Sequence, residues 1–354
     1  MRMRFAALIV VCLGSLAAAQ ALAQTTVRVG WCSRTISSAV APFAIATRMG
    51  WFAKDGIKVE LIPLPGSTDC IKFVATGEIE YAVASVEPLP TIRAQGVKAK
   101  IFYTAYQGFV YGIAVPRDSA INSMADLKGK SIGVTSMASA GVIVARALAA
   151  NAGLNPDRDI RIVVAGEGAQ TAALLRGRQV EALSQFDTQY AIVENAGLKL
   201  RVLPNKEIER FPSNGFIALE ETVRTKRKQV VALAQGYAKG TLFALNNPQA
   251  AIRMLWEVYP QTRPTGKPEN VALKDDVKVL EARMQNWKLE RGGVTKWGES
   301  SDSNYAAYLE FLHKWGVIKA KPATAELITN ELIADINNFE QAKIAADAKA
   351  YKSP

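Results

Sequence analysis

Short runs of β-branched and aromatic residues alternate with longer segments of helical periodicity between residues 27 and 195 of this chain. This alternation predicts parallel strands, because consecutive parallel strands need a crossover connection that is usually a helix. A first series contains strands at 27–31, 57–62 and 81–84 and helices at 39–52, 69–76 and 88–95. The predicted fold class is therefore α/β, with helices packed on a mostly parallel sheet.

A second series of the same kind follows, with strands at 131–135, 160–164 and 180–183 and helices at 140–151, 168–176 and 188–195. Extended passages at 101–106 and 111–115 lie between the two series. The chain then returns to a strand at 216–219 and is mainly helical beyond Glu220. We predict two α/β lobes with a cleft between them: a discontinuous first lobe (24–113 and 213–354, with a helical C-terminal part) and a second lobe (114–212).

The N-terminus carries a predicted export signal. Arg2 and Arg4 precede an apolar run at residues 5–13, and Ala21-Leu22-Ala23 has the small-residue pattern of a cleavage site. A membrane anchor would need about 20 strongly apolar residues, whereas this run gives way to Gly14, Ser15 and alanines. We expect cleavage of residues 1–23 after Ala23 and a soluble, monomeric protein in the periplasm.

The charged and titratable residues exclude several classes of function. The chain holds a single histidine, His313, and no H-x-x-x-H or C-x-x-C pair, so we expect neither a metal site nor histidine-dependent catalysis. The net charge of +11 falls to +9 without Arg2 and Arg4, and the basic residues are scattered rather than clustered. We therefore expect no nucleic-acid partner and no cofactor.

Cys32 and Cys70 are the two cysteines that remain after signal cleavage. In an oxidising compartment an even pair is a disulfide candidate, and two buried free thiols are the alternative.

Ligands of open α/β sheets bind at the carboxyl ends of the strands, and those ends carry hydroxyl and acidic residues here. The segments are 31–34, 65–69, 85–87, 135–139, 166–168 and 186–188. Hydroxyls and free N–H groups at helix starts can hold a polar group, although the same residues serve as ordinary N-caps. Glu87 and Asp187, expected on opposite lobes, could clamp amino groups or merely cap helices. Gly166-Glu167-Gly168 lacks the third glycine of a dinucleotide loop, so a nucleotide site is not indicated.

Five stretches of the sequence are distinctive: PFAIATRMGWFAKDGI at 42–57, DLKGKSIGV at 126–134, and residues 66–69, 75–82 and 185–190. These stretches resemble the periplasmic solute-binding proteins of the nitrate, sulfonate, taurine and thiamine-precursor group, which are the NMT1/THI5-like and SsuA-like proteins. The resemblance covers about residues 27–245. It implies a type II periplasmic binding protein that closes on its ligand by hinge motion and presents it to the permease and ATPase of an ABC importer.

The resemblance also implies which residues contact the ligand. Those at strand ends are Trp31, Ser33, Arg34, Ser67, Thr68, Ser85, Glu87, Ser136, Ser139 and Asp187, and those near the lobe crossings are Tyr106, Gln107 and Asn214. Arg34 suits an anionic ligand, whereas Glu87 and Asp187 favour a ligand with hydrogen-bond donors. A sulfonate, a carboxylate and a pyrimidine-like or aromatic compound all remain open.

Three functions are compatible with this pattern. The first is a binding protein without catalysis, which we favour because the cysteine-rich C-C-C-F-C motif of the related thiamine-pyrimidine synthases is missing. The second is a secreted enzyme of the same fold, for which Glu87 or Asp187 would supply the titratable group. The third is a ligand sensor that acts on a membrane receptor.

Overall fold

A computed structural model describes residues 24–352. The chain forms two five-stranded sheets, with strand order β2-β1-β3-β10-β4 in the first and β7-β6-β8-β5-β9 in the second. The first sheet contains β1 (Thr25–Trp31), β2 (Ile57–Pro63), β3 (Tyr81–Ala84), β4 (Ala99–Thr104) and β10 (Gly215–Leu219). The second contains β5 (Ala114–Pro116), β6 (Lys130–Val134), β7 (Ile160–Val164), β8 (Ala182–Leu183) and β9 (Leu200–Val202).

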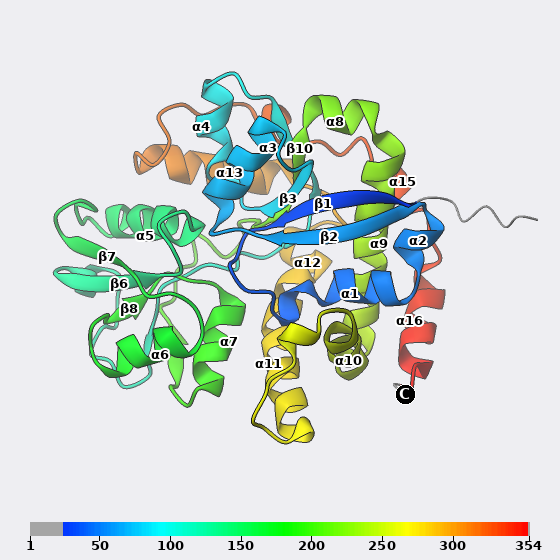
Figure 1. Cartoon of the computed structure of the whole chain (residues 1–354). Coiled ribbons are helices and arrows are strands. Elements are labelled where there is room, and N and C mark those ends of the chain that lie inside the picture. Colours follow the sequence, from blue (N-terminus) through cyan, green and yellow to red (C-terminus); the bar gives the residue numbers. More distant parts are fainter. Residues whose placement is uncertain (1–23, 353–354) are drawn as a thin grey trace, which may run out of the picture.

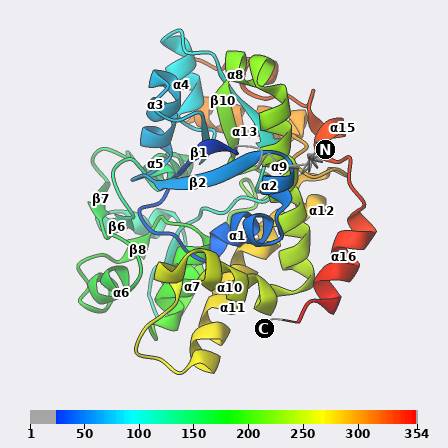
Figure 2. The ribbon, with the colours of Figure 1, turned by 45° about the vertical axis from the view of Figure 1, so that its right-hand side comes forward.

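Helices cover both sheets and make up the C-terminal part (Figure 1, Figure 2). Beside the first sheet lie η1 (Ser38–Val40), α1 (Ala41–Arg48), α2 (Trp51–Lys54), α3 (Ser67–Thr76) and α4 (Leu89–Ala94). Beside the second lie η2 (Ala125–Leu127), α5 (Ala140–Asn151), α6 (Ala169–Arg176) and α7 (Asp187–Asn195). The C-terminal part contains α8 (Glu220–Thr225), α9 (Arg227–Asn246), α10 (Pro248–Val258), η3 (Pro260–Thr262), α11 (Glu269–Trp287), α12 (Leu289–Gly292), α13 (Asp302–Lys314), α14 (Thr324–Leu327), α15 (Ile333–Ile336) and α16 (Gln341–Ala350).

The strands of the two β-α series are parallel, as predicted. β1 runs parallel to β2 and β3, and β6 runs parallel to β7 and β8. The strands next to the crossings are antiparallel: β10 pairs with β3 and β4 in this way, and β5 pairs with β8 and β9. Both sheets are therefore mixed, because the chain enters the second sheet along β5 and returns to the first along β10.

Some predicted elements have different bounds. The predicted helix at 39–52 is interrupted at Gly50, whose φ of +70° ends α1 and starts α2. The passage predicted at 111–115 forms only the short β5, and Tyr111 instead pairs with Phe186 in an isolated bridge. The strand β9 was not predicted, because its three residues carry too little periodic signal.

The larger core lies beneath the first sheet. Aromatic rings from four elements meet there, and Phe43 and Phe216 both lie 4.9 Å from Tyr237, between ring centroids. α9 packs closely on α1 at Gly240, where a side-chain carbon would overlap the backbone of Pro42. The second sheet has a smaller core of its own, built mainly from alanine, leucine and valine side chains. The larger core also includes side chains of the second sheet and of α5, such as Ile132 and Leu148, so it continues from one sheet to the other.

Cys32 and Cys70 are joined by a disulfide, with their Cα atoms 5.9 Å apart. Cys32 follows β1 and Cys70 lies in α3, so the bond ties the loop after β1 to the helix that follows β2. Cys70 is fully buried. No helix within residues 24–352 has both the length and the apolar character required to cross a membrane. The predicted signal peptide, residues 1–23, lies outside the described residues.

Replacing Cys32 and Cys70 together by alanine should lower the free energy of unfolding. The bond closes a loop with a sequence separation of 38 residues, and removal of such a constraint from the unfolded chain costs about 4 kcal/mol. Urea titration without reductant measures the difference, and wild type with reductant is the control. Equal unfolding free energies for variant and oxidised wild type would contradict the expectation.

Candidate functional site

The loops at the carboxyl ends of the parallel strands meet across the boundary between the two sheets. The Ser136 hydroxyl donates to the carbonyl oxygen of Pro65 (2.7 Å), and the Thr68 N–H donates to the carbonyl oxygen of Ala138 (3.2 Å). Pro65 and Thr68 follow β2, whereas Ser136 and Ala138 follow β6. The structure is therefore closed, with direct polar contacts between the two halves.

Glu167 adds a second set of contacts across the same boundary. Its Oε1 accepts hydrogen bonds from the Ser33 hydroxyl (2.9 Å) and the Arg34 N–H (3.3 Å), and its Oε2 accepts one from the Thr35 hydroxyl. Gly166 and Gly168 flank Glu167 with φ of +71° and +63°, a turn that residues with side chains rarely adopt. The Gly-Glu-Gly motif thus presents a carboxylate to the other half of the molecule.

A cavity of about 20 Å³ remains between the two halves, roughly the room of one water molecule. Four of its lining residues were predicted as ligand contacts: Trp31, Ser33, Tyr106 and Asn214. Six more lining residues were not predicted as ligand contacts: Cys32, which was predicted as a disulfide partner, and Val83, Val110, Tyr111, Phe186 and Arg283. Four aromatic rings therefore border this small interior space, together with an amide and a guanidinium.

The acid Glu87 is buried and does not line this cavity; with Thr68 it lines a different pocket of about 400 Å³, between α3, α4 and α5. Its Oε1 accepts a hydrogen bond from the Tyr308 hydroxyl, and its Oε2 has no hydrogen-bond partner among residues 24–352. Burial raises the pKa of Glu87 above its ordinary value, because a charge is poorly solvated there. The neighbouring Ser85 N–H donates to the Ser67 hydroxyl oxygen (3.1 Å), which fixes the end of β3 against the start of α3.

Other predicted contacts lie around the cavity or away from it. Ser139 accepts a hydrogen bond from the Gly141 N–H (3.1 Å) and therefore caps α5. Gln107 is buried and donates to the carbonyl oxygens of Thr104 and Glu299, so it does not line the cavity. The side chain of Arg34 is exposed.

Asp187 makes a buried ion pair with Arg283 of α11. Nη2 of Arg283 lies 2.6 Å from Oδ1 of Asp187, and Nε lies 2.9 Å from Oδ2. Nδ2 of Asn286 donates to the same carboxylate (2.8 Å), as does the Thr188 N–H (2.7 Å). The guanidinium stands 4.0 Å from the centre of the Tyr106 ring. Burial alone would lower the pKa of Arg283, but the Asp187 carboxylate outweighs it and raises that pKa.

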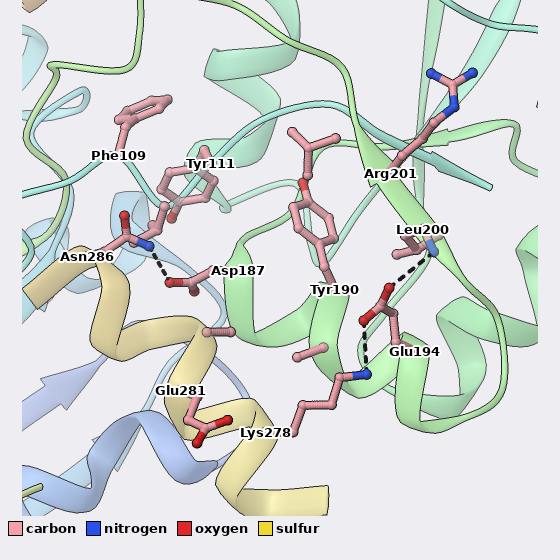
Figure 3. A pocket seen from close by; sticks show the side chains of 14 residues that line it. Phe109, Tyr111, Asp187, Tyr190, Glu194, Leu200, Arg201, Lys278, Glu281 and Asn286 are labelled. Atoms are coloured by element: carbon pink, nitrogen blue, oxygen red, sulfur yellow. Dashed lines mark hydrogen bonds and ion pairs between the residues drawn. The ribbon is translucent and has the colours of Figure 1, made fainter. Parts of the chain in front are cut away.

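A larger pocket of about 560 Å³ lies on the outer side of this ion pair, between α7, β9 and α11. Figure 3 shows Asp187 and Asn286 on one wall and the ion pair of Glu194 with Lys278 on another. Tyr111 lines both this pocket and the inner cavity. Asp187 thus lines the larger pocket, whereas its partner Arg283 lines the small inner cavity.

A third hollow of about 280 Å³ lies at the rim of the boundary, lined by the loop at residues 35–38, Glu167 and Asp276 of α11. Burial raises the pKa of Asp276 to about 6, and Asp275 adds to the shift. A hydrogen bond from Trp256 Nε1 to Oδ2 (2.8 Å) opposes it. Among the described residues, no cluster of three or more His, Cys, Asp or Glu side chains is arranged to hold a metal ion.

The sequence matches the family described as NMT1/THI5 like over residues 37–251, more than half of the chain. The chain belongs to this family. The assignment confirms the resemblance seen in the sequence, and the matched residues include strands of both sheets.

Two similar proteins are named for different functions. The riboflavin-binding protein RibY of Chloroflexus aurantiacus is 22% identical over 296 residues, covering 83% of this chain and 82% of RibY. The 4-amino-5-hydroxymethyl-2-methylpyrimidine phosphate synthase of Legionella pneumophila is 21% identical over 225 residues, covering 63% of this chain and 70% of the synthase.

Solved structures give the fold. The alkanesulfonate-binding protein SsuA of Xanthomonas axonopodis pv. citri superposes with a TM-score of 0.63 at 17% identity, covering 86% of this chain and 98% of SsuA. The fold is that of the type II periplasmic binding proteins, as predicted.

Arg283, Asn286 and Glu167 are the polar residues of the site that sequence reasoning missed as contacts. Arg283 and Asn286 lie on α11, far along the chain from every strand end, and nothing in the local pattern shows that α11 packs on α7. Glu167 had a usable signal, because it lies at a strand end between two glycines.

Replacing Gly66 by alanine should separate the two halves. Gly66 has an extended backbone that any residue can adopt, but a side-chain carbon there would overlap the carbonyl oxygen of Ala138 across the boundary. We expect a larger radius of gyration by X-ray scattering in solution, with an unchanged far-UV circular dichroism spectrum. Gly177→Ala is the control, because its new carbon would meet ordinary contacts of 3.4 Å or more. Equal radii for Gly66→Ala and wild type would refute this role.

Replacing Asp276 by asparagine should change how stability depends on pH. The pKa in the folded state, about 6, lies above the ordinary 3.8, so the contribution of Asp276 is fully present below about pH 4 and lost as the pH rises through 6. The stability of the variant relative to wild type should therefore rise by about 2 kcal/mol between pH 4 and pH 7. Urea titrations at several pH values test this, with the exposed Asp118→Asn as control. A pH-independent difference would contradict it.

Proposed function

We propose that this protein is an exported solute-binding protein that captures a small organic ligand between its two lobes by hinge closure and delivers it to an ABC importer. The observation that carries the proposal is the inner cavity, where strand ends from both sheets bring polar side chains and four aromatic rings together. The loop contacts across the boundary, such as those of Ser136 with Pro65 and of Ser33 with Glu167, are hydrogen bonds that can break and re-form as the lobes open and close around a ligand. The names of RibY and SsuA, both binding proteins, support this function.

The site that we propose is formed by both lobes, with boundaries at residues 24–113 and 213–354 for the first and 114–212 for the second. Its ligand contacts are drawn from the strand ends and crossings: Trp31, Ser33, Arg34, Ser67, Thr68, Ser85, Glu87, Tyr106, Asn214, Ser136 and Ser139. Asp187 acts at the same site through its ion pair with Arg283. Gln107 plays an indirect part: its side chain donates a hydrogen bond to the carbonyl oxygen of Glu299 and so anchors the first passage between the lobes. The rings that border the cavity favour a ligand with a flat part, which suits a pyrimidine or aromatic compound and also an aromatic sulfonate or carboxylate.

The proposed function also implies a cellular location and partner proteins. We propose a periplasmic, monomeric protein released from its signal peptide after Ala23, with the permease and ATPase of an importer as its partners. We also propose that it is not an enzyme. The synthase relative supports the alternative of catalysis, for which the buried Glu87 would be the candidate acid or base.

Native mass spectrometry of the exported protein tests the proposal. The protein is incubated with an equimolar mixture of sulfonates, carboxylates, pyrimidines and flavins, separated from free solute, and weighed intact. We expect one added solute per protein chain, with the mass of that solute unchanged after release. A released compound of altered mass would favour the enzyme, and no retained solute from any class would refute the binding function.

Gly66→Ala should weaken the retained solute's binding in the same experiment. The overlap with Ala138 also destabilises the closed, solute-bound arrangement, and a cost of about 1.4 kcal/mol there lowers the affinity about ten-fold. Isothermal titration calorimetry measures the affinity, with Gly177→Ala as the matched control. Unchanged affinity in a variant that scattering shows to be open would contradict hinge closure.

A further inference from the structure

We infer that the ligand carries an anionic group, and that this group takes the place of Asp187 on the buried guanidinium of Arg283. This inference rests on the proposed function and names the ligand class of the same site. In the ligand-free protein Asp187 would act as an internal stand-in for the ligand's anion.

Arg283 has the properties of a buried anion receptor. Only 2% of its surface is exposed, it lines the inner cavity, and the ring of Tyr106 supports one face of the guanidinium. Within residues 24–352 its one ion-pair partner is Asp187. Its Nε and Nη2 donate to that carboxylate, and no hydrogen bond joins Nη1 to another described residue. The guanidinium of this cavity-lining residue therefore has one nitrogen without a protein partner among the described residues.

Asp187 is placed so that it can leave this pairing without losing all its partners. Its carboxylate also accepts from Asn286 Nδ2 and from the Thr188 N–H. It borders the open 560 Å³ pocket, where water can solvate the released carboxylate (Figure 3). Arg283, by contrast, is almost fully buried and lines the small inner cavity. The carboxylate can thus exchange one charged partner for water, whereas the guanidinium cannot.

This difference in solvation between Asp187 and Arg283 favours a negatively charged ligand. A neutral ligand that displaced Asp187 would leave a buried guanidinium without a counter-ion, which is strongly unfavourable. An anion that displaced Asp187 would restore a charge-assisted, bidentate pairing. The rings of Trp31, Tyr111 and Phe186 on the cavity wall suit an aromatic group next to the anion. The ligand class is therefore an aromatic or otherwise planar acid.

Paired acids and amides test the inference on the whole exported protein. The probes are benzoate with benzamide, nicotinate with nicotinamide, and benzenesulfonate with benzenesulfonamide, each titrated by calorimetry. We expect at least one acid to bind about ten-fold or more tightly than its neutral partner. Equal affinities within every pair, or binding of neutral compounds alone, would overturn the inference while leaving the solute-binding function in place. Retention of no solute, acid or neutral, would overturn both.

Two substitutions separate ligand recognition from a structural role of the ion pair. Arg283→Gln should weaken binding of the preferred acid about ten-fold or more. Asp187→Asn should strengthen binding of the same acid, because the variant lacks the carboxylate that competes with the ligand for the guanidinium of Arg283. A purely structural pair would predict weaker binding in both variants, and that result would refute the exchange.

Lys278→Gln is the matched control for the same helices. Lys278 also lies on α11 and pairs with Glu194 of α7 (3.0 Å), so this variant removes one positive charge and one ion pair between α11 and α7. It is half exposed and does not line the inner cavity. We expect acid affinity within about two-fold of wild type, as for a screened surface charge. A loss equal to that of Arg283→Gln would assign the effect to net charge and refute the specific role of Arg283.

Discussion

Parallel pairing is the constraint on which this molecule depends. Because β1, β2 and β3 run in one direction, and β6, β7 and β8 do the same in the second sheet, each sheet collects the loops after its strands at one edge. The two edges face each other across one boundary. Hydroxyls, carboxylates and backbone groups far apart in the chain are thereby brought within hydrogen-bond distance, as with Ser33 and Glu167.

The loop contacts that cross the boundary are polar, and this has an energetic consequence. Each hydrogen bond that crosses it exchanges protein and water partners at a modest net free energy, so closed and open arrangements of the halves can lie close in free energy. The buried pair of Asp187 and Arg283 differs, since separating it would strand a charge in an enclosed space. Breaking the loop hydrogen bonds therefore costs little free energy, whereas separating Asp187 from Arg283 requires another counter-ion for the guanidinium.

Much of this could be predicted from the sequence, because periodicity and strand ends are local properties. The two β-α series, the α/β fold class and the strand-end residues Trp31 and Ser33 were accessible in this way, whereas Tyr106 and Asn214 were predicted from the family resemblance. The helical break at Gly50 was not, since glycine in a helical pattern is tolerated as often as it ends one. Glu87 and Asp187 were expected as a clamp or as caps, and the structure gives each a protein partner.

The partners themselves were beyond local reasoning. Asp187 meets Arg283 only because α11 packs against α7, and a helix pattern reports which face is apolar without saying what covers it. The sequence alone does not distinguish a buried arginine from a solvent-exposed one. Tertiary packing alone separates Arg283 from the many scattered basic residues of this chain.

The small volume of the inner cavity sets the order of events when a solute arrives. A space for about one water molecule cannot admit an organic compound, so a solute has to meet the protein while the halves stand apart. The observed rate of association should then stop rising with solute concentration and level off at the rate of opening. At high solute concentration, the rate of binding would therefore be limited by the opening of the two halves rather than by diffusion.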